Sequence, residues 1–337
     1  MQEHGNVMVF MEHRNGEPAE VSLELMCKAR ELADTLGVGV EAAVIGSSHG
    51  YGLESLGRYG CQRVYSVQHP GLDGFTSVPY AKALVQIISS CEPRIVLFGA
   101  TTTGRDLAPR VASQLQCGLT ADCTDLQIGE HKVKGQVYAD VLLQIRPAFG
   151  GNIVATIVSP NNWPSMATVR EGVMPKREDA SHQPAQIVPV DVDLSPTDFP
   201  TQILEVVRKD KSVDLKKAKI IVSAGMGASD RRAWEMIFEA ARVLGGVVGA
   251  SRPVVDAGIV PKEHQVGQTG TTVRPTLYIA CGISGQIQHR AGMMEAQRII
   301  AINSDPQAPI FDIAHYGIVG DVKQVLQHMI KSYKDKA

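Results

Sequence analysis

Two glycine-containing turns in the second half of the sequence are the strongest candidates for chemistry. Gly225-Met226-Gly227 stands between a predicted strand and a predicted helix. There, open α/β sheets bind phosphates through free backbone N–H groups. Ser284-Gly285-Gln286 begins another predicted helix and offers a second site of this type. The first turn departs from G-x-G-x-x-G because Asp230 stands at the last position, so a plain tight turn explains it about as well.

A polar loop and two basic side chains could complete a ligand site. The loop Gln265-Val266-Gly267-Gln268-Thr269-Gly270 carries amides and a hydroxyl that suit a planar heterocycle, although such loops can also be mere connections. Arg252 follows a predicted strand end and can face an anion. His289 could donate to a ligand carbonyl, and its protonation would supply positive charge. Taken alone, a surface arginine and a helix-start histidine in water are the ordinary interpretations.

Acidic and amide side chains follow the later strands. Asn303 and Asp305 could bind ribose or adenine, or form an ordinary Asx turn. Asp321 could cap the last helix. The six cysteines form no C-x-x-C pair, and the sequence has neither H-E-x-x-H nor G-x-x-x-x-G-K-[ST]. We therefore predict no metal ligands and no catalytic residue.

The elements that position these residues alternate along the chain. In the first half, strands and helices in turn predict a doubly wound, mostly parallel α/β sheet. The strands are expected at 7–10, 40–45, 63–67 and 95–99, and the helices at 22–36, 54–59, 79–90 and 101–115. Residues 133–139, 141–145 and 153–157 are predicted as antiparallel additions to that sheet.

The second half predicts a Rossmann-like parallel sheet of its own. Its strands are expected at 219–223, 247–249, 276–280 and 298–302, and its helices at 230–244, 285–297 and 322–332. Residues 174–200 contain five prolines, which is typical of an interdomain linker, with one strand expected at 187–192. We therefore predict two α/β domains, residues 1–195 and 196–337.

The amino-acid composition argues against nucleic acid and membranes as binding partners. The 33 basic and 35 acidic residues leave a net charge of −2, so no general positive field holds nucleic acid. No apolar run approaches the ~20 residues that cross a bilayer, so membrane insertion is not expected. The polar segment at 1–6 lacks the pattern of a leader, and a cytoplasmic location is predicted.

The motifs in combination closely resemble the alpha subunit of electron transfer flavoprotein. The resemblance covers essentially the whole chain and is most specific from 223 to 321. It rests on blocks that occur in order, among them Ser251-Arg252, the loop at 265–270, Tyr278, Gly282 to Gly285, Gln288-His289, Asn303 and Asp305-Pro306. The first half agrees more loosely, through Gly104 to Arg110, Leu119 to Asp122 and Arg146 to Asn152.

The resemblance implies an N-terminal nucleotide-hydrolase-like domain that contacts a beta subunit, and a C-terminal domain that binds FAD. Ser251 and Arg252 then lie by the flavin and its phosphates, and Thr269 lies near N5. The other implied FAD contacts are Met226, Val266, Gly267, Gln268, Ser284, Gly285, Gln286, Ile287, Gln288, His289, Asn303, Asp321 and Val322. Positive charge from Arg252 and His289 would favour a flavin that takes up one electron as an anion.

The family resemblance also implies a function. The chain would shuttle single electrons between an acyl-CoA dehydrogenase, or a related flavoenzyme, and another redox partner, rather than act on an organic substrate of its own. In a second branch of the family, NADH reduces a flavin on the beta subunit and electrons bifurcate toward ferredoxin or flavodoxin, and the segment at 167–176 favours that branch. The alternative is a regulatory nucleotide-binding module without electron transfer. Met226, where the family usually has Arg, keeps that alternative open.

Overall fold

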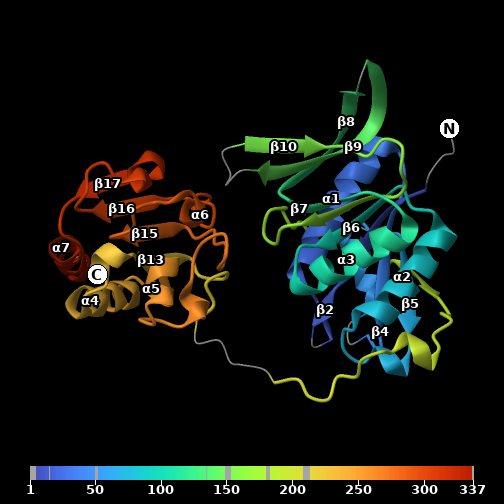
Figure 1. The fold of residues 1–337 in the computed structure, drawn as a ribbon, viewed down its shortest axis with the longest axis horizontal. Helices are drawn as coiled ribbons and strands as arrows, with labels where there is room; N and C mark the ends of the chain where they lie inside the picture. Colours follow the sequence, from blue (N-terminus) through green and yellow to red (C-terminus); the bar gives the residue numbers. More distant parts are fainter. Residues whose placement is uncertain are drawn as a thin grey trace. The chain divides into compact units, whose positions relative to one another are not determined.

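The chain divides into two compact units, Met1–Val206 and Val207–Ala337, each described here by itself (Figure 1). The computed structural model describes residues 5–14, 16–49, 52–133, 135–148, 153–179, 183–207 and 213–335. The division at 206/207 falls after the 195/196 boundary of the sequence prediction. Phe199 accounts for part of the difference, because it lies beyond residue 195 and packs against the core of the first unit.

A seven-stranded sheet with all neighbours parallel forms the centre of the first unit. Its strand order is β12-β5-β4-β1-β6-β11-β7. The strands are β1 (Val7–Phe10), β4 (Val40–Gly46), β5 (Arg63–Gln68), β6 (Ile95–Gly99), β7 (Leu119–Cys123), β11 (Ser165–Val169) and β12 (Gln186–Pro189). The predicted doubly wound parallel sheet is confirmed, and β7 and β11 are strands that the sequence analysis missed.

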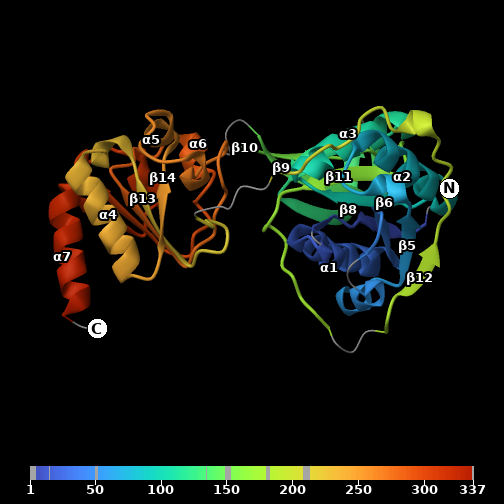
Figure 2. The same cartoon turned by 90° about the horizontal axis from the view of Figure 1, so that it is seen from below.

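Helices cover both faces of this sheet (Figures 1 and 2). Helix α1 (Glu20–Leu36) packs on one face with the 3₁₀ turn η1 (Leu53–Tyr59), and α2 (Ser77–Cys91) and α3 (Thr102–Leu115) pack on the other. The Thr101 side chain caps α3 by accepting the Gly104 N–H at 3.0 Å, as its position before the helix predicts. Smaller elements are β2 (His13–Arg14), β3 (Glu17–Pro18), η2 (Pro70–Leu72) and η4 (Pro196–Asp198).

The antiparallel strands of the first unit form a separate sheet, so their predicted addition to the main sheet is wrong. Its order is β10-β9-β8, from Ile153–Ile157, Gln136–Ala148 and Asp125–Val133. The predicted break at residue 140 is wrong too, because β9 continues through Asp140. That residue adopts a left-handed φ of 54°, which Asp tolerates better than most residues.

The proline-rich segment at 174–200 is not a free linker, which corrects the sequence analysis. Its strand β12 pairs in parallel with β5, and Val190, Val192 and Leu194 pack against the core beneath. Burial of these aliphatic side chains outweighs the turn preference of the prolines around them.

The second unit contains a five-stranded sheet with all neighbours parallel, in the order β14-β13-β15-β16-β17. The strands are β13 (Ile220–Ala224), β14 (Val247–Ala250), β15 (Leu277–Cys281), β16 (Ile299–Asn303) and β17 (Tyr316–Val319). The predicted parallel sheet is confirmed, and only β17 was missed. Numbered from β13, this is the order 2-1-3-4-5, whose switch point lies between β13 and β15.

The two faces of this second sheet are covered differently. Helices α4 (Arg231–Val243) and α7 (Val322–Lys334) lie side by side on one face (Figure 2). Buried side chains of the intervening loops, among them Val266, Met293 and Ile310, cover the other face. The short elements are η5 (Met226–Ala228), α5 (Arg252–Asp256), η6 (Lys262–His264), α6 (Ile287–Arg290) and η7 (Pro309–Ile313).

The predicted helix at 285–297 is wrong, because α6 spans only Ile287–Arg290. Gly285 has a left-handed φ of 86°, which prevents the helix from starting at Ser284. Gln286 occupies the N-cap position without a side-chain bond, so Ser284 is not the cap. At the other end, Gly292 packs directly on Gly267, where a Cβ would lie 2.4 Å from the Gly267 Cα.

Candidate functional site

Two glycine turns meet at the switch point of the second sheet. The turn after β13 donates two hydrogen bonds to the end of β15 and the turn that follows it. Gly225 N–H donates to the Cys281 carbonyl at 2.8 Å, and Gly227 N–H donates to the Gly282 carbonyl at 3.1 Å. A Cβ on Gly225 would lie 2.1 Å from the Gly282 carbonyl oxygen. Only glycine allows this approach, which brings the two predicted turns to the carboxyl edge of the sheet.

A cavity of about 580 Å³ opens at this edge. That volume lies in the range of small-molecule and cofactor sites. The cavity brings together most of the site residues predicted from sequence, namely Met226, Ser251, Arg252, Val266, Gly267, Gln268, Thr269, Ser284, Gly285, Gln286, Gln288, His289 and Asn303. Asp305 and the glycines Gly225, Gly227 and Gly282 also line it.

Three predicted contacts lie outside the cavity lining: Ile287, Asp321 and Val322. The Asp321 carboxylate caps α7 by accepting the N–H groups of Lys323 and Gln324 at 3.0 and 3.1 Å. Val322 is 5% exposed and belongs to the core beneath α7. The capping role explains Asp321 fully, and a contact of these three residues with a ligand stays a prediction from the resemblance.

Several apolar lining residues were not predicted as site residues. Four residues without a polar side chain also line the cavity: Pro253, Ile283, Ala308 and Pro309. The Ile310 N–H donates to the Ser284 carbonyl at 3.0 Å and thereby holds the 308–310 segment against the second glycine turn. This contact joins loops that are more than twenty residues apart, which explains why local patterns do not reveal it.

The polar loop is built to present the Thr269 hydroxyl. The Gln265 side-chain amide donates to Thr269 Oγ1 at 3.0 Å, so the hydroxyl proton is left for another acceptor. The loop is fixed to α6 by the Gln268 N–H, which donates to the Gln288 carbonyl at 2.7 Å. Thr269 itself is exposed at the cavity. A hydroxyl donor in this position suits a ring nitrogen acceptor.

His289 differs from its predicted role. It is 8% exposed, and burial lowers its pKa to about 4, an effect that the nearby Val266 backbone offsets in part. The imidazole of the protein without flavin is therefore neutral at pH 7, and positive charge from His289 beside a reduced flavin stays a prediction from the resemblance. What it offers is an N–H dipole in the cavity wall.

Arg252 is the cationic side chain of the described cavity lining. It begins α5 directly after β14, and its Nε donates to the Asp256 carboxylate at 3.2 Å. The side chain stays 65% exposed, so this ion pair is solvated and weak. Met226, half exposed in the first glycine turn, adds no charge. The positive potential of the cavity therefore depends mainly on Arg252.

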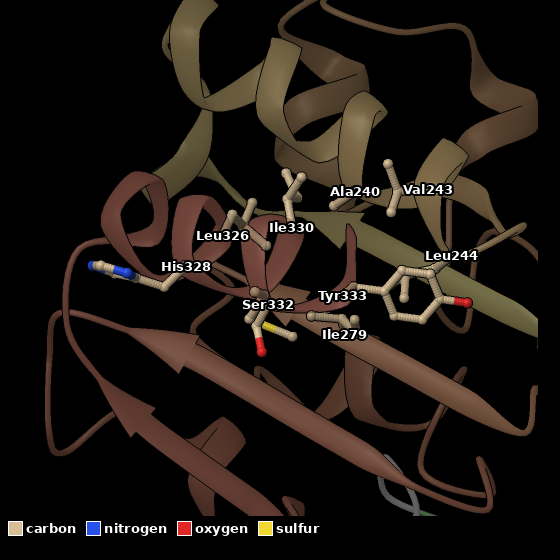
Figure 3. Close-up of a pocket in the computed structure, with 10 residues that line it drawn as sticks. Ala240, Val243, Leu244, Ile279, Leu326, His328, Ile330, Ser332 and Tyr333 are labelled. Carbon is tan, nitrogen blue, oxygen red and sulfur yellow. The ribbon is translucent and has the colours of Figure 1, made fainter. Parts of the chain in front are cut away.

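A second cavity, of about 450 Å³, lies between α4, α7 and strand β15 (Figure 3). Aliphatic side chains dominate its wall, among them Ala240, Ile279 and Leu326. Figure 3 shows the His328 imidazole directed away from the other labelled side chains. None of the residues predicted for chemistry lines this groove.

Comparison with known families identifies the chain. The description "Electron transfer flavoprotein domain" matches residues 7–195, and "Electron transfer flavoprotein FAD-binding domain" matches residues 214–294. The chain belongs to the electron transfer flavoprotein alpha-subunit family. It binds FAD, and the second match contains most of the cavity described above.

Named relatives cover nearly the whole chain. It is 47% identical to an electron transfer flavoprotein subunit alpha of Thermoanaerobacterium thermosaccharolyticum, over 99% of both chains. It is 41% identical to the acryloyl-CoA reductase electron transfer subunit beta of Anaerotignum propionicum, over 98% of this chain and 96% of the relative. It is 40% identical to the lactate dehydrogenase (NAD(+),ferredoxin) subunit LctC of Acetobacterium woodii, over 96% of this chain and 76% of the relative. Each of these three relatives is named as a subunit.

The cavity fits FAD by its own construction. Gly225 and Gly285 let the segments around the cavity pack backbone to backbone, because a Cβ would lie 2.1 Å from the Gly282 carbonyl oxygen and 2.3 Å from the Ile310 nitrogen. The His289 Nδ1 atom is buried without a hydrogen bond of good geometry to the described residues. Phosphates, a ring with acceptor atoms and ribose hydroxyls are the partners that such glycine turns, Arg252 and Asn303 suit. No described helix combines the length and hydrophobicity that crossing a bilayer requires.

Proposed function

We propose that FAD lies along the carboxyl edge of the second sheet and that the cavity residues hold it. The glycine turns at 225–227 and 282–285 accommodate the phosphates, and the loop at 265–270 faces the flavin ring. Asn303 fixes the second turn, because its amide donates to the Ile283 carbonyl at 2.9 Å, and its place at the adenosine end rests on the resemblance. The observation that carries the proposal is the convergence of these separate segments on one cavity of about 580 Å³.

The chain itself tunes and orients the cofactor. Bound FAD supplies both one-electron and two-electron redox chemistry. Arg252 places positive charge near the ring, which favours added electrons. Thr269 offers a hydroxyl proton, and His289 offers a neutral imidazole. Among the described lining residues, amides, hydroxyls and glycines dominate, which supports an electron carrier without an organic substrate of its own.

We further infer a heterodimer with an electron transfer flavoprotein beta subunit. The first unit would contact that subunit, and an acyl-CoA dehydrogenase or related flavoenzyme would exchange electrons with the bound FAD. Whole-length similarity to alpha subunits supports this assembly. The exposure of the cavity edge also supports this assembly, since Met226, Gln268 and Thr269 are accessible to a partner.

A second candidate function is NADH-dependent electron bifurcation toward ferredoxin or flavodoxin. One relative is named for NAD(+) and ferredoxin, and another for acryloyl-CoA reductase. The sequence segment at 167–176 favours the same branch. In this chain, the first three residues of the segment, Ala167 to Val169, are buried in β11 between β6 and β7 and have a structural role. The second flavin would be held largely by the beta subunit.

The two functions are separated by a flavin count and an anaerobic titration of the co-purified complex. A simple carrier contains one FAD per heterodimer and is reduced by an acyl-CoA dehydrogenase with its substrate, while NADH leaves it oxidised. A bifurcating complex contains two FADs and is reduced rapidly by NADH. A complex that contains no flavin would overturn both functions and favour a regulatory nucleotide-binding module.

A further inference from the structure

Tyr278 is a fully buried tyrosine directly behind the FAD cavity. It lies in β15 with 0% exposure, and its hydroxyl is 3.0 Å from Nε2 of His289. The two ring centroids are 6.2 Å apart. Tyr278 does not line the cavity, whereas His289 does. The tyrosine therefore reaches the cavity only through the histidine.

The hydroxyl of Tyr278 is unusual for its surroundings. The ring packs in an aliphatic cluster with Ile221, Met293 and Ile299, where phenylalanine would fill the same space. A buried hydroxyl without a partner is unfavourable, so a tyrosine in such a place normally has a hydrogen bond. The imidazole of His289 provides that bond. The polar neighbour Ser223 is itself buried and makes no hydrogen bond of good geometry to the described residues.

The protonation states determine the direction of this bond. Burial is the main cause that raises the pKa of Tyr278 far above its ordinary value, and the neighbouring Ser223 hydroxyl lowers it only in part. The phenol is therefore protonated at pH 7 and can donate. Neutral His289 has one nitrogen that accepts and one that carries the proton. With Nε2 accepting from Tyr278, the proton is on Nδ1.

We propose that Tyr278 is a positioning residue that fixes His289 as the neutral Nδ1–H tautomer and holds its ring in the wall of the FAD cavity. The inference rests on the proposed contact between His289 and FAD. The hydrogen bond from Tyr278 keeps the Nε2 edge of the imidazole toward the core. The opposite edge then carries the proton, on Nδ1. Such a bond from behind orients a ligand-facing histidine as a carboxylate or carbonyl does at a metal site.

The tautomer is measurable in the wild-type complex. Histidine labelled with ¹⁵N gives distinct NMR signals for the Nδ1–H and Nε2–H tautomers, and His289→Gln identifies the signal among the ten histidines. We expect wild-type His289 to be the Nδ1–H form at pH 7. An Nε2–H form in the wild type would overturn the inference without any further variant.

The variant Tyr278→Phe removes the hydroxyl and keeps the ring. We expect its His289 to populate both tautomers, its flavin absorption bands to shift, and the dissociation constant of FAD to rise about tenfold, since a buried imidazole nitrogen loses its partner. Tyr80→Phe is the matched control. Tyr80 is 5% exposed in the first unit, and its hydroxyl donates to the Leu72 carbonyl at 3.2 Å. This control should leave the His289 tautomer and the flavin spectrum unchanged.

The variants separate two kinds of failure. If His289→Gln leaves the flavin spectrum and FAD affinity unchanged, the proposed contact of His289 with FAD is wrong. If His289→Gln changes both while Tyr278→Phe changes neither the tautomer nor the spectrum, only the role of Tyr278 is overturned. A changed tautomer with an unchanged flavin spectrum would overturn the link from Tyr278 to the cofactor.

Discussion

Gly225 and Gly282 meet backbone to backbone at the switch point of the second sheet, where a Cβ on Gly225 would lie 2.1 Å from the Gly282 carbonyl oxygen. The glycines belong to the turns after β13 and β15, which are adjacent strands. Their contact sets the distance between the two turns that we assign to the FAD phosphates. The geometry of the cofactor site therefore depends on the absence of two side chains.

Replacing Gly225 by alanine should separate the two turns. The new methyl group would collide with backbone atoms, which cannot move aside as a flexible side chain can. We expect the FAD content of the purified complex to fall at least tenfold, measured by absorbance after extraction of the flavin.

Gly245→Ala is the matched control for this variant. Gly245 has a φ of 68°, but a Cβ there would meet nothing within 4 Å. Its strain is expected to cost about 1 kcal/mol of stability without loss of flavin. Full FAD content in Gly225→Ala would contradict our account of the two turns.

Removing the charge of Arg252 should weaken the hold on FAD and lower the flavin redox potential. Arg252 is the cationic side chain of the described cavity lining, so alanine removes positive charge that favours added electrons. We expect FAD to dissociate severalfold more readily, with a smaller effect at high salt. Spectroelectrochemical titration measures the potential, and equilibrium dialysis measures the affinity.

Arg231→Ala controls for the loss of an exposed arginine. Its Nε donates to Glu235 at 3.1 Å across one helical turn, as Arg252 does to Asp256 at 3.2 Å, but Arg231 lies outside the cavity lining. Arg231→Ala should change neither the flavin redox potential nor the affinity for FAD. Equal effects of the two variants would show that Arg252 has no specific role toward the flavin.

Replacing Met226 by the arginine that the family usually has at this position should strengthen FAD binding. Met226 lines the cavity and is 50% exposed, so Met226→Arg introduces a solvated cation beside the phosphates. A solvated ion pair contributes roughly 0.2–1 kcal/mol, which predicts an affinity gain of at most about fivefold at low salt.

The control for Met226→Arg is Met294→Arg, at a methionine that is 52% exposed and outside the cavity lining. Isothermal titration of flavin-depleted complex at low and high salt compares the two. An equal gain from both variants would indicate a general charge effect and not a phosphate contact.

The buried imidazole of His289 predicts a dependence of stability on pH. Burial lowers its folded-state pKa to about 4 from the ordinary value of 6.5, so the unfolded chain binds the proton first as the pH falls. The stabilisation is complete above pH 6.5 and is lost as the pH falls toward 4. Linkage predicts a loss of about 2 kcal/mol between pH 7.5 and pH 5.

Urea unfolding of the flavin-depleted chain tests this dependence. Trp234 lies in the second unit, and Trp163→Phe removes the other of the two tryptophans, so fluorescence reports on that unit alone. The free energy of unfolding should fall more steeply with pH when His289 is present than in His289→Gln. Parallel pH profiles would contradict the lowered pKa.

Strands and their adjacent turns could be predicted from the sequence because each signal is local. An apolar segment followed by Gly225 or Arg252 indicates a strand and its carboxyl end without reference to distant residues. The length of α6 could not be predicted. It is limited by contacts with Gly267, a residue twenty-five positions before Gly292, and by the left-handed Gly285.

The charge state of His289 could not be predicted from the sequence either, because it also depends on distant residues. Its position after a glycine turn predicts solvent exposure, but Tyr278 and the 265–270 loop enclose it in the fold. A strand was predicted at 187–192, but the pairing of β12 (Gln186–Pro189) with β5 was not, since only the folded first unit provides β5. In each case, burial by distant segments outweighs the local preference.

The most direct test of the central claim is an anaerobic reductive titration of the complex between this chain and its beta subunit. Our account predicts that the FAD of the second unit accepts its first electron at a clearly higher potential than its second, so that absorbance changes in two resolved steps. It also predicts that Arg252→Ala brings the two steps closer together. A single two-electron step in the wild type, or a complex without FAD, would contradict the assignment of this chain as a one-electron carrier.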